Sequence, residues 1–346
     1  MERLAGLAVT RDGAARRRRL LTAMAAVGAA GSNPLAAIAA ASAPTTGSEW
    51  LKRIRDAATD RSYLGTATFS TGGAVSSSRL AHFCDGDQRF EKVEGLDGKL
   101  RLQYRHNDRL VTLWPASRVA VVEQYVGVPD FPALPADALR ADGHYAMQSI
   151  GVKRACGFDA DVLRFEPRDE HRFGQTLWAE RRSGLLLRAE TFGPKGEVLE
   201  TSAFIELAFA RRPDVQSILK PMRRLDGWRI VRPKVVKTRI EAEGWQLVRP
   251  VPGFDLVACH RRPLDTSDAI DVESAVQVVQ AVYSDGLAQV SVFVEPYDAV
   301  RHRSGHSMIG ATHTSMSRRD DKWLTVVGEV PLSTVQAFES ALERRH

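Results

Sequence analysis

The stretch that most constrains this fold runs from Ala160 to Phe209, because it reads as four short strands in series. Apolar side chains recur along it at strand spacing. They are Val162, Leu163 and Phe165, then Phe173, Leu177 and Trp178, then Leu185 to Ala189, and finally Leu199, Ala203, Ile205, Leu207 and Phe209. Turn residues interrupt the run at Pro167 and Asp169, at Ser183-Gly184 and at residues 193–196. Because such short loops join neighbouring strands, residues 160–209 predict an antiparallel β-meander.

The chain before the meander predicts one helix and six more strands. Trp50, Leu51 and Ile54 recur at helical spacing within residues 49–60, and Ser48 is suited to cap that helix. Prolines break the strand pattern between residues 128 and 151, where residues 136–140 and 145–150 read as short helices. The expected strands are residues 63–71, 78–84, 89–93, 100–104, 109–114 and 119–124.

A single antiparallel sheet of about ten strands must curl. Helices on its concave side would leave an apolar pocket beneath them, and such a pocket is a common ligand site. Side chains that simply fill the space are the alternative. Residues 44–210 therefore predict a long, curled antiparallel sheet with helices on its concave side, in a protein of the α+β class.

A basic stretch punctuated by prolines, residues 211–240, reads as a linker between two domains. Its charge fits either a solvated surface or a contact with an acidic partner. Residues 241–346 then predict a smaller C-terminal α+β domain, long enough for a core of its own. Its expected elements are strands at 245–248, 254–260, 276–283, 288–295 and 323–328, a tight turn at Ser284-Asp285-Gly286, and a closing helix marked by Leu332, Val335, Phe338 and Leu342.

The N-terminus has the pattern of an export signal. Arg16–Arg19 precede an Ala-rich apolar stretch that runs to about Ala43, and small residues suited to cleavage lie at 39–43. We expect residues 1–43 to be removed and the remaining chain to be periplasmic, with an uncleaved membrane anchor as the alternative. No later stretch reaches the roughly 20 apolar residues of a membrane span.

The three cysteines, Cys84, Cys156 and Cys259, leave at least one thiol free. An exported protein meets an oxidising compartment, and Cys84 and Cys156 fall in the same expected domain. A disulfide between these two and a set of buried free thiols are both open. The cysteine spacing does not match a zinc site.

The sequence carries none of the catalytic or nucleotide-binding motifs GxSxG, HExxH, GxGxxG and the phosphate-binding loop. Much of the net charge of +6 comes from Arg11 and Arg16–Arg19. No basic stripe interleaved with aromatic residues suggests a nucleic-acid partner. We therefore expect a binding protein, not an enzyme, with no cofactor, no metal and no nucleic acid.

Several short motifs follow one another in order between residues 50 and 342. In the first domain they are PRD at 167–169, RFG at 172–174, LW at 177–178, SGL at 183–185 and GEVLE at 196–200. In the second they are PGF at 252–254, RRPL at 261–264, YSDGL at 283–287 and VGEVP at 327–331. In this order, behind an export signal, they resemble the RseB/MucB family of periplasmic regulators of a sigma-E or AlgU type envelope-stress sigma factor.

The resemblance implies both a fold and a role. The large domain should be a half-barrel under a helical lid, similar to the lipoprotein carrier LolA and the receptor LolB. The small domain should bind the periplasmic segment of an RseA/MucA-type anti-sigma factor and shield it from its first, DegS-type protease. Lipopolysaccharide or another acyl lipid should release the regulator, through a coupling free energy of ~1–3 kcal/mol.

Two sets of candidate site residues accompany this expectation. Acyl chains would enter the half-barrel, and a packed core is the alternative for its candidate lining residues, which are Tyr63, Phe69, Leu113, Trp114, Leu177 and Ile205. The anti-sigma factor would contact Arg261 and Arg262, for which a solvated strand end is the alternative. The competing function is a periplasmic carrier of lipid or lipoprotein, and a homo-oligomer is also open.

Overall fold

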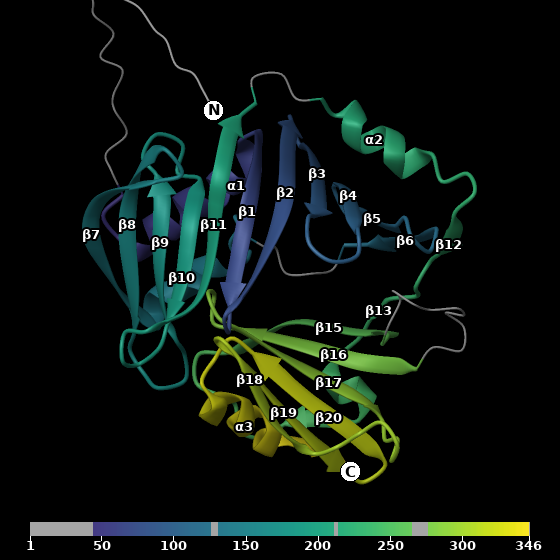
Figure 1. The fold of residues 1–346 in the computed structure, drawn as a ribbon. Helices are drawn as coiled ribbons and strands as arrows, with labels where there is room; N and C mark the ends of the chain where they lie inside the picture. Colours follow the sequence, from purple (N-terminus) through teal and green to yellow (C-terminus); the bar gives the residue numbers. More distant parts are fainter. Residues whose placement is uncertain (1–43, 126–130, 211–213, 265–275, 346) are drawn as a thin grey trace, which may run out of the picture. The chain divides into compact units, whose positions relative to one another are not determined.

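The large domain is built on one 12-stranded sheet that contains the predicted meander (Figure 1). The computed structural model describes residues 44–125, 131–210, 214–264 and 276–345. The strand order is β12-β6-β5-β4-β3-β2-β1-β11-β10-β9-β8-β7, and all neighbours are antiparallel except β12 and β6. Its strands are β1 (Tyr63–Thr71), β2 (Ala74–Asp85), β3 (Gln88–Gly95), β4 (Leu102–His106), β5 (Arg109–Trp114), β6 (Val119–Gln124), β7 (Tyr145–Ala155), β8 (Phe158–Pro167), β9 (Gly174–Glu180), β10 (Leu186–Phe192), β11 (Val198–Phe209) and β12 (Arg229–Val231).

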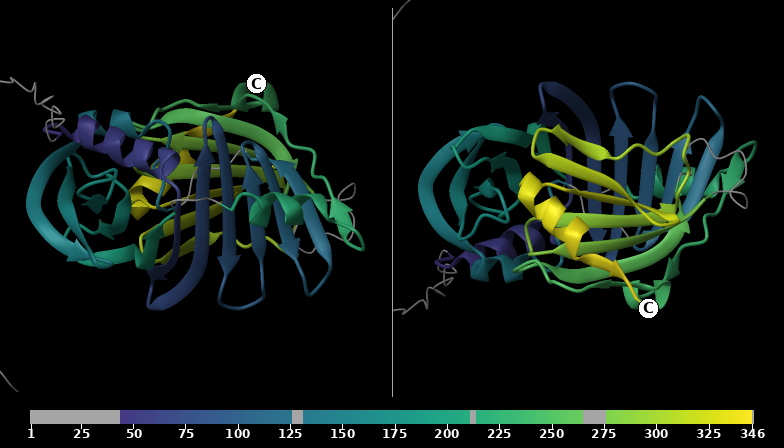
Figure 2. Two further views of the ribbon diagram at one scale, coloured as in Figure 1. Left: turned by 90° about the horizontal axis from the view of Figure 1, so that it is seen from above. Right: turned by 90° about the horizontal axis from the view of Figure 1, so that it is seen from below.

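Helix α1 (Gly47–Asp60) covers one face of strands β8, β9 and β10, which curl beneath it (Figure 2). Its apolar stripe, which includes Leu51 and Ile54, is fully buried against that face. Thr46, not the predicted Ser48, caps the helix, because its hydroxyl accepts the amide of Glu49 and the Glu49 carboxylate accepts the amide of Thr46. The short 3-10 helix η1 (Ala138–Gly143) lies beside α1, so the predicted helical lid is present.

Helix α2 (Gln216–Arg223) covers the opposite face of the sheet, over β3 and β4 (Figure 1). Its buried Ile218 and Met222 pack against Val111 and Leu113. The chain then adds β12 to the edge strand β6 and β13 (Val236–Lys237) to the second sheet. The described part of the predicted linker, residues 214–240, is therefore packed along both domains.

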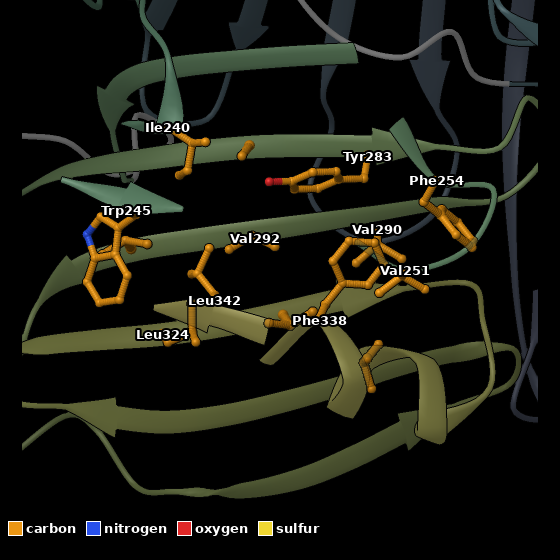
Figure 3. Packing of buried hydrophobic residues seen from close by; sticks show 14 of the residues in the cluster. Ile240, Trp245, Val251, Phe254, Tyr283, Val290, Val292, Leu324, Phe338 and Leu342 are labelled. Carbon is orange, nitrogen blue, oxygen red and sulfur yellow. The ribbon is translucent and has the colours of Figure 1, made fainter. Parts of the chain in front are cut away.

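The smaller domain has its own sheet and core. A seven-stranded sheet runs in the order β13-β15-β16-β17-β20-β19-β18, and β14 pairs with β21. Helix α3 (Leu332–Ala341) brings Phe338 onto this sheet, where it meets Tyr283 and Phe254 (Figure 3). The remaining elements are η2 (Ile240–Glu243), β14 (Trp245–Leu247), β15 (Asp255–Pro263), β16 (Gln277–Ser284), β17 (Gln289–Pro296), β18 (Gly305–Ile309), β19 (Thr312–Arg319), β20 (Lys322–Gly328) and β21 (Leu342–Arg344).

This architecture confirms the predicted fold class, a large antiparallel sheet with helical cover plus a smaller α+β domain. The helix predicted at residues 145–150 is wrong, because these residues belong to β7, the edge strand that pairs along the whole of β8. The predicted export signal, residues 1–43, lies outside the described residues. Within the described ranges, no helix has the length and apolar character needed to cross a bilayer.

Candidate functional site

A large cavity lies where the concave face of the large sheet meets the smaller sheet. Its volume is about 710 Å³, within the range of small-molecule sites. Strands β1, β2, β10 and β11 line it on one side and strands β17, β19 and β20 on the other. Residues 131–135, which precede η1, form a further part of its wall.

The cavity wall has an apolar part and a polar part. Leu134, Leu177, Leu186 and Leu287 belong to the core cluster beneath α1 and also line the cavity. Elsewhere the wall carries hydroxyl and amide groups from both sheets, namely Ser76, Ser78, Gln103, Gln175, Thr191, Ser202, Gln289 and Ser291. A ligand with one apolar and one polar end would find complementary surfaces in this cavity.

The turn between β16 and β17 inserts into the large domain next to this cavity. Its Asp285 is completely buried, and Oδ1 accepts the amides of Leu287 (2.9 Å) and Ala288 (2.7 Å). The other oxygen, Oδ2, accepts the Tyr145 hydroxyl at 3.0 Å and pairs with Arg172 Nη1 at 2.5 Å. Both carboxylate oxygens are thus satisfied, as a buried charge requires.

Tyr145, which donates a hydrogen bond to Asp285, stays protonated. Burial and the negative charge of Asp285 raise the pKa of Tyr145 well above its ordinary value, so the phenol keeps the proton that it donates. Arg172 also donates to the Pro252 carbonyl at 2.8 Å and to Asp169 Oδ1 at 2.9 Å. One buried arginine therefore binds the small domain at two points.

A second contact joins the β18–β19 turn to the large sheet. Buried Glu200 accepts hydrogen bonds through Oε1 from the Thr71 hydroxyl at 2.8 Å, the Ala311 amide at 3.2 Å and the Thr312 hydroxyl at 3.3 Å. Gly310 has φ +58°, and a Cβ there would lie 2.1 Å from the Thr71 hydroxyl. The close approach of the β18–β19 turn to the end of β1 therefore requires glycine at residue 310.

Two family models match this chain, one for each domain. The MucB/RseB N-terminal domain matches residues 46–222, and the MucB/RseB C-terminal domain matches residues 239–343. The chain belongs to the MucB/RseB family. The match to both domains, in order, confirms the resemblance that the short motifs suggested.

Individual members of the family are similar along most of their length. The AlgU regulatory protein MucB of Pseudomonas aeruginosa is 28% identical over 295 residues, which cover 84% of this chain and 88% of MucB. The sigma-E factor regulatory protein RseB of Escherichia coli K12 is 26% identical over 76% of this chain and 79% of RseB. A solved structure of MucB in complex with MucA(peri) has a TM-score of 0.63 and 26% identity, covering 86% of this chain and 99% of that one.

The structure divides the six predicted lipid-contact residues of this MucB/RseB protein into two groups. Phe69 and Leu177 line the large cavity, and Tyr63 lines a second cavity of about 110 Å³. The other three, Leu113, Trp114 and Ile205, line neither cavity. Whether any of the six contacts a lipid stays a prediction.

Strand geometry explains why three residues lie elsewhere. Leu113 faces α2 on the opposite side of the sheet, and Trp114 packs against Val119 and Val231 at the β6 edge. Ile205 falls at an irregularity in the β1–β11 pairing and is 63% exposed. The side chains of β11 therefore do not alternate strictly between the two faces of the sheet. The bulge turns the side chains that follow it to the opposite face.

The two predicted anti-sigma contacts, Arg261 and Arg262, lie on β15 beside β13. Arg261 is half exposed and holds both oxygens of Glu243, at 2.8 and 2.7 Å. Arg262 lies near Glu123 on β6, where burial raises the pKa of Glu123 and the positive charge of Arg262 opposes that rise. Arg261 would have to leave Glu243, at least in part, in order to bind a partner through its guanidinium.

Of the two alternatives left open for Cys84 and Cys156, the structure has free thiols at both positions, and Cys259 is free as well. Cys84 lies on β2, where its thiol donates to the Asp60 carbonyl at 3.0 Å. Cys156 lies in the β7–β8 turn, and burial raises the pKa of its thiol. Burial also raises the pKa of Cys259 to about 11, which keeps that thiol protonated.

Sequence reasoning did not identify the residues that join the two domains. The sequence marks Asp169 and Asp285 as turn residues and shows Arg172 and Glu200 only as parts of motifs. The available signal was the combination of an acidic turn residue with a following glycine in Ser284-Asp285-Gly286. That pattern identifies a turn but not what the turn contacts.

Proposed function

We propose that this protein binds the periplasmic segment of a MucA-type anti-sigma factor and shields it from the first protease of the stress response. Binding of an acyl lipid or lipopolysaccharide lowers the affinity for that segment and so releases the anti-sigma factor to proteolysis. The protein acts through binding and carries out no catalysis itself.

The observation that carries this proposal is the similarity, over both domains, to the structure of MucB solved with MucA(peri). The relatives named above are sigma factor regulatory proteins, and the match extends over nearly the whole of the MucB chain. A carrier of lipid would need the large domain, whereas the second domain and its contacts to the first fit a two-state regulator.

The cavity supports the lipid step of the proposal. Its apolar lining residues, such as Leu177 and Leu186, can contact methylene groups, each of which contributes about 0.8 kcal/mol on burial. Its hydroxyl and amide groups can bind the head group. Since residues of both sheets line the same cavity, a ligand there would change the free energy of closing one domain on the other.

A protease-protection assay tests the whole scheme. Residues 44–346, which form one compact unit, are mixed with the periplasmic segment of the organism's anti-sigma factor and its DegS-type protease, with and without lipopolysaccharide. Protection that lipopolysaccharide reverses is the expected result. Lipid binding without any binding of the segment would instead support a lipid or lipoprotein carrier.

A matched pair of variants tests where the lipid binds. Ala189→Phe places a ring in the cavity wall, while Ala208→Phe places one on an exposed position of β11. We expect the first variant to bind the anti-sigma segment and to resist release by lipid, and the second to behave as the unmodified protein. Equal release of both variants would place the lipid outside this cavity.

The proposal also places the protein in the periplasm. The basic and apolar pattern of residues 1–43 supports export. Fractionation of cells followed by N-terminal sequencing should find the protein in the periplasm with a new terminus near residue 40 to 44. A full-length chain that remains in the membrane fraction would favour an uncleaved anchor.

A further inference from the structure

The positive charge of the expected mature chain is concentrated in one segment, residues 214–240, which we call the basic strap. The full sequence has a net charge of +6, and residues 1–43 contribute six basic and two acidic side chains to it. Residues 44–346 therefore carry only +2. The strap alone has eight basic and two acidic side chains, a net charge of +6, so the rest of residues 44–346 is acidic by −4.

The basic side chains of the strap face solvent. Six of them are exposed and form no ion pair with another described residue, namely Lys220, Arg223, Arg224, Arg232, Lys234 and Lys237. The apolar side chains Ile230 and Val236, which lie between them in the chain, are 38% and 42% exposed. Single apolar side chains of this exposure are common on protein surfaces, so the strap is distinguished from the rest of residues 44–346 by its concentrated positive charge.

The fold holds this segment in place. Ile218 and Met222 fix α2 to the large sheet, and on a helix Lys220 and Arg223 then point away from that sheet. Farther along, β12 pairs with β6 and β13 pairs with β15. The charges are therefore displayed by a fixed backbone, and less conformational entropy is lost when they bind a partner.

We propose that the basic strap is a docking surface for an anionic lipid bilayer. Clustered Lys and Arg side chains are attracted to anionic lipids, and exposed apolar side chains among them can enter the interface. Neither of the two cavities described above is lined by a strap residue, so a groove for an acidic peptide is not evident there. This inference goes beyond the proposed function, because it concerns neither the anti-sigma segment nor the lipid cavity.

Co-sedimentation with vesicles tests the inference. Residues 44–346 are mixed with vesicles of phosphatidylcholine alone or of phosphatidylcholine with phosphatidylglycerol. Binding is expected only to the second kind, and it should fall steeply with salt, because screening shortens the electrostatic range from ~10 Å at 0.1 M to ~3 Å at 1 M.

A matched set of variants locates the binding surface. The triple variant Arg224→Gln, Arg232→Gln, Lys234→Gln should bind anionic vesicles about tenfold more weakly or worse, since each basic residue near the surface contributes about fivefold. The control Lys153→Gln, Arg154→Gln, Lys195→Gln removes the same charge from other exposed positions and should retain binding within about twofold of the unmodified protein.

Three outcomes would overturn the inference. The first is an equal loss of vesicle binding in the two triple variants, and the second is equal binding to neutral and anionic vesicles. The third is binding of a soluble glutamate-rich peptide without binding to vesicles. The last of these would identify an acidic protein segment as the partner. Retained binding of the soluble anti-sigma segment by the strap variant separates this test from that of the proposed function.

Discussion

At the scale of single residues, the contact between the domains depends on the turn residue Gly286. Its φ is +106°, and a Cβ would lie 2.8 Å from the Ala141 amide nitrogen and 2.9 Å from the Asp137 carbonyl oxygen. These are backbone atoms, which cannot move aside as a flexible side chain could. A methyl group at residue 286 would therefore separate the turn from η1.

Gly286→Ala should lower the free energy of unfolding by more than the ~1–3 kcal/mol that a strained backbone angle costs. Gly196→Ala is the matched control, because Gly196 also has a positive φ, +79°, but no atom lies within 4 Å of its Cβ position. Denaturant unfolding of both variants measures the difference. If the two variants lose the same stability, the steric contact at η1 contributes nothing.

The Glu91 carboxylate makes the free energy of unfolding depend on pH. Its carboxylate lies 3.2 Å from His82 Nδ1 and 3.0 Å from Arg105 Nη1. Burial acts to raise the pKa of Glu91, but the hydrogen bond from His82 and the charge of Arg105 outweigh it, so the pKa lies below its ordinary value. The folded state thus favours the ionised carboxylate, and the stabilisation is present above about pH 4.3 and lost as the pH falls through the lowered pKa.

Glu91→Gln should therefore be less stable than the unmodified protein at pH 7, and the difference should shrink as the pH falls below about 4. Urea midpoints measured between neutral and acid pH test this. The exposed Glu170 provides a control, since Glu170→Gln should leave the acid dependence unchanged. A constant difference at every pH would mean that Glu91 acts through packing and not through its charge.

At the scale of elements, α2 shows how a segment with little sequence signal becomes part of a domain. Ile218 is fully buried between the helix and the large sheet. Ile218→Ala should cost about 2–4 kcal/mol of unfolding free energy. Gln216→Ala, at an exposed position of the same helix, should change it by less than about 0.5 kcal/mol. Equal, small effects would show that α2 adds little to the stability of the large domain.

The strands best predicted from sequence are those whose ends carry turn residues. β1, β5 and β6 have the predicted bounds, 63–71, 109–114 and 119–124, because Gly and Asp residues or a short polar turn limit them. The sequence does not predict β7, because its residues 148–154 are exposed and its conformation depends on pairing with β8. The strands β18 and β19 are mostly polar and lack apolar alternation, so the sequence does not predict them.

The candidate site was less predictable than the fold. Phe69 and Leu177 lie in β1 and β9, strands that the sequence predicts, and both line the cavity. The position of Ile205 could not be predicted, because the bulge in β11 has no clear sequence signal. The contacts of Arg172 with Asp285 and of Glu200 with Ala311 join residues more than 100 positions apart, and pairs of that kind cannot be identified from a single sequence.

At the scale of the whole molecule, buried polar contacts couple the two domains. Asp285→Asn keeps an acceptor for the turn amides but removes one of the two carboxylates that pair with the buried Arg172, the other being Asp169, and should cost about 1.5–3 kcal/mol. Calorimetry should show one unfolding transition for the unmodified protein and two separate transitions for the variant.

The exposed ion pair of Arg140 with Asp255 joins the same two domains and offers the control. Asp255→Asn should cost less than about 1 kcal/mol and keep a single transition. Two transitions already present in the unmodified protein would show that the Asp285 contact does not couple the domains.

The chain between β12 and β13 limits how far the domains can separate. Only residues 232–235 lie between the strand that ends on the large sheet and the strand that begins on the small one. Even fully extended, such a segment spans no more than about 18 Å. If the Asp285 and Glu200 contacts both break, the small domain stays at an effective concentration of the order of millimolar beside the large one. Reclosure is then an intramolecular step, and its rate does not depend on how much of the protein the cell contains.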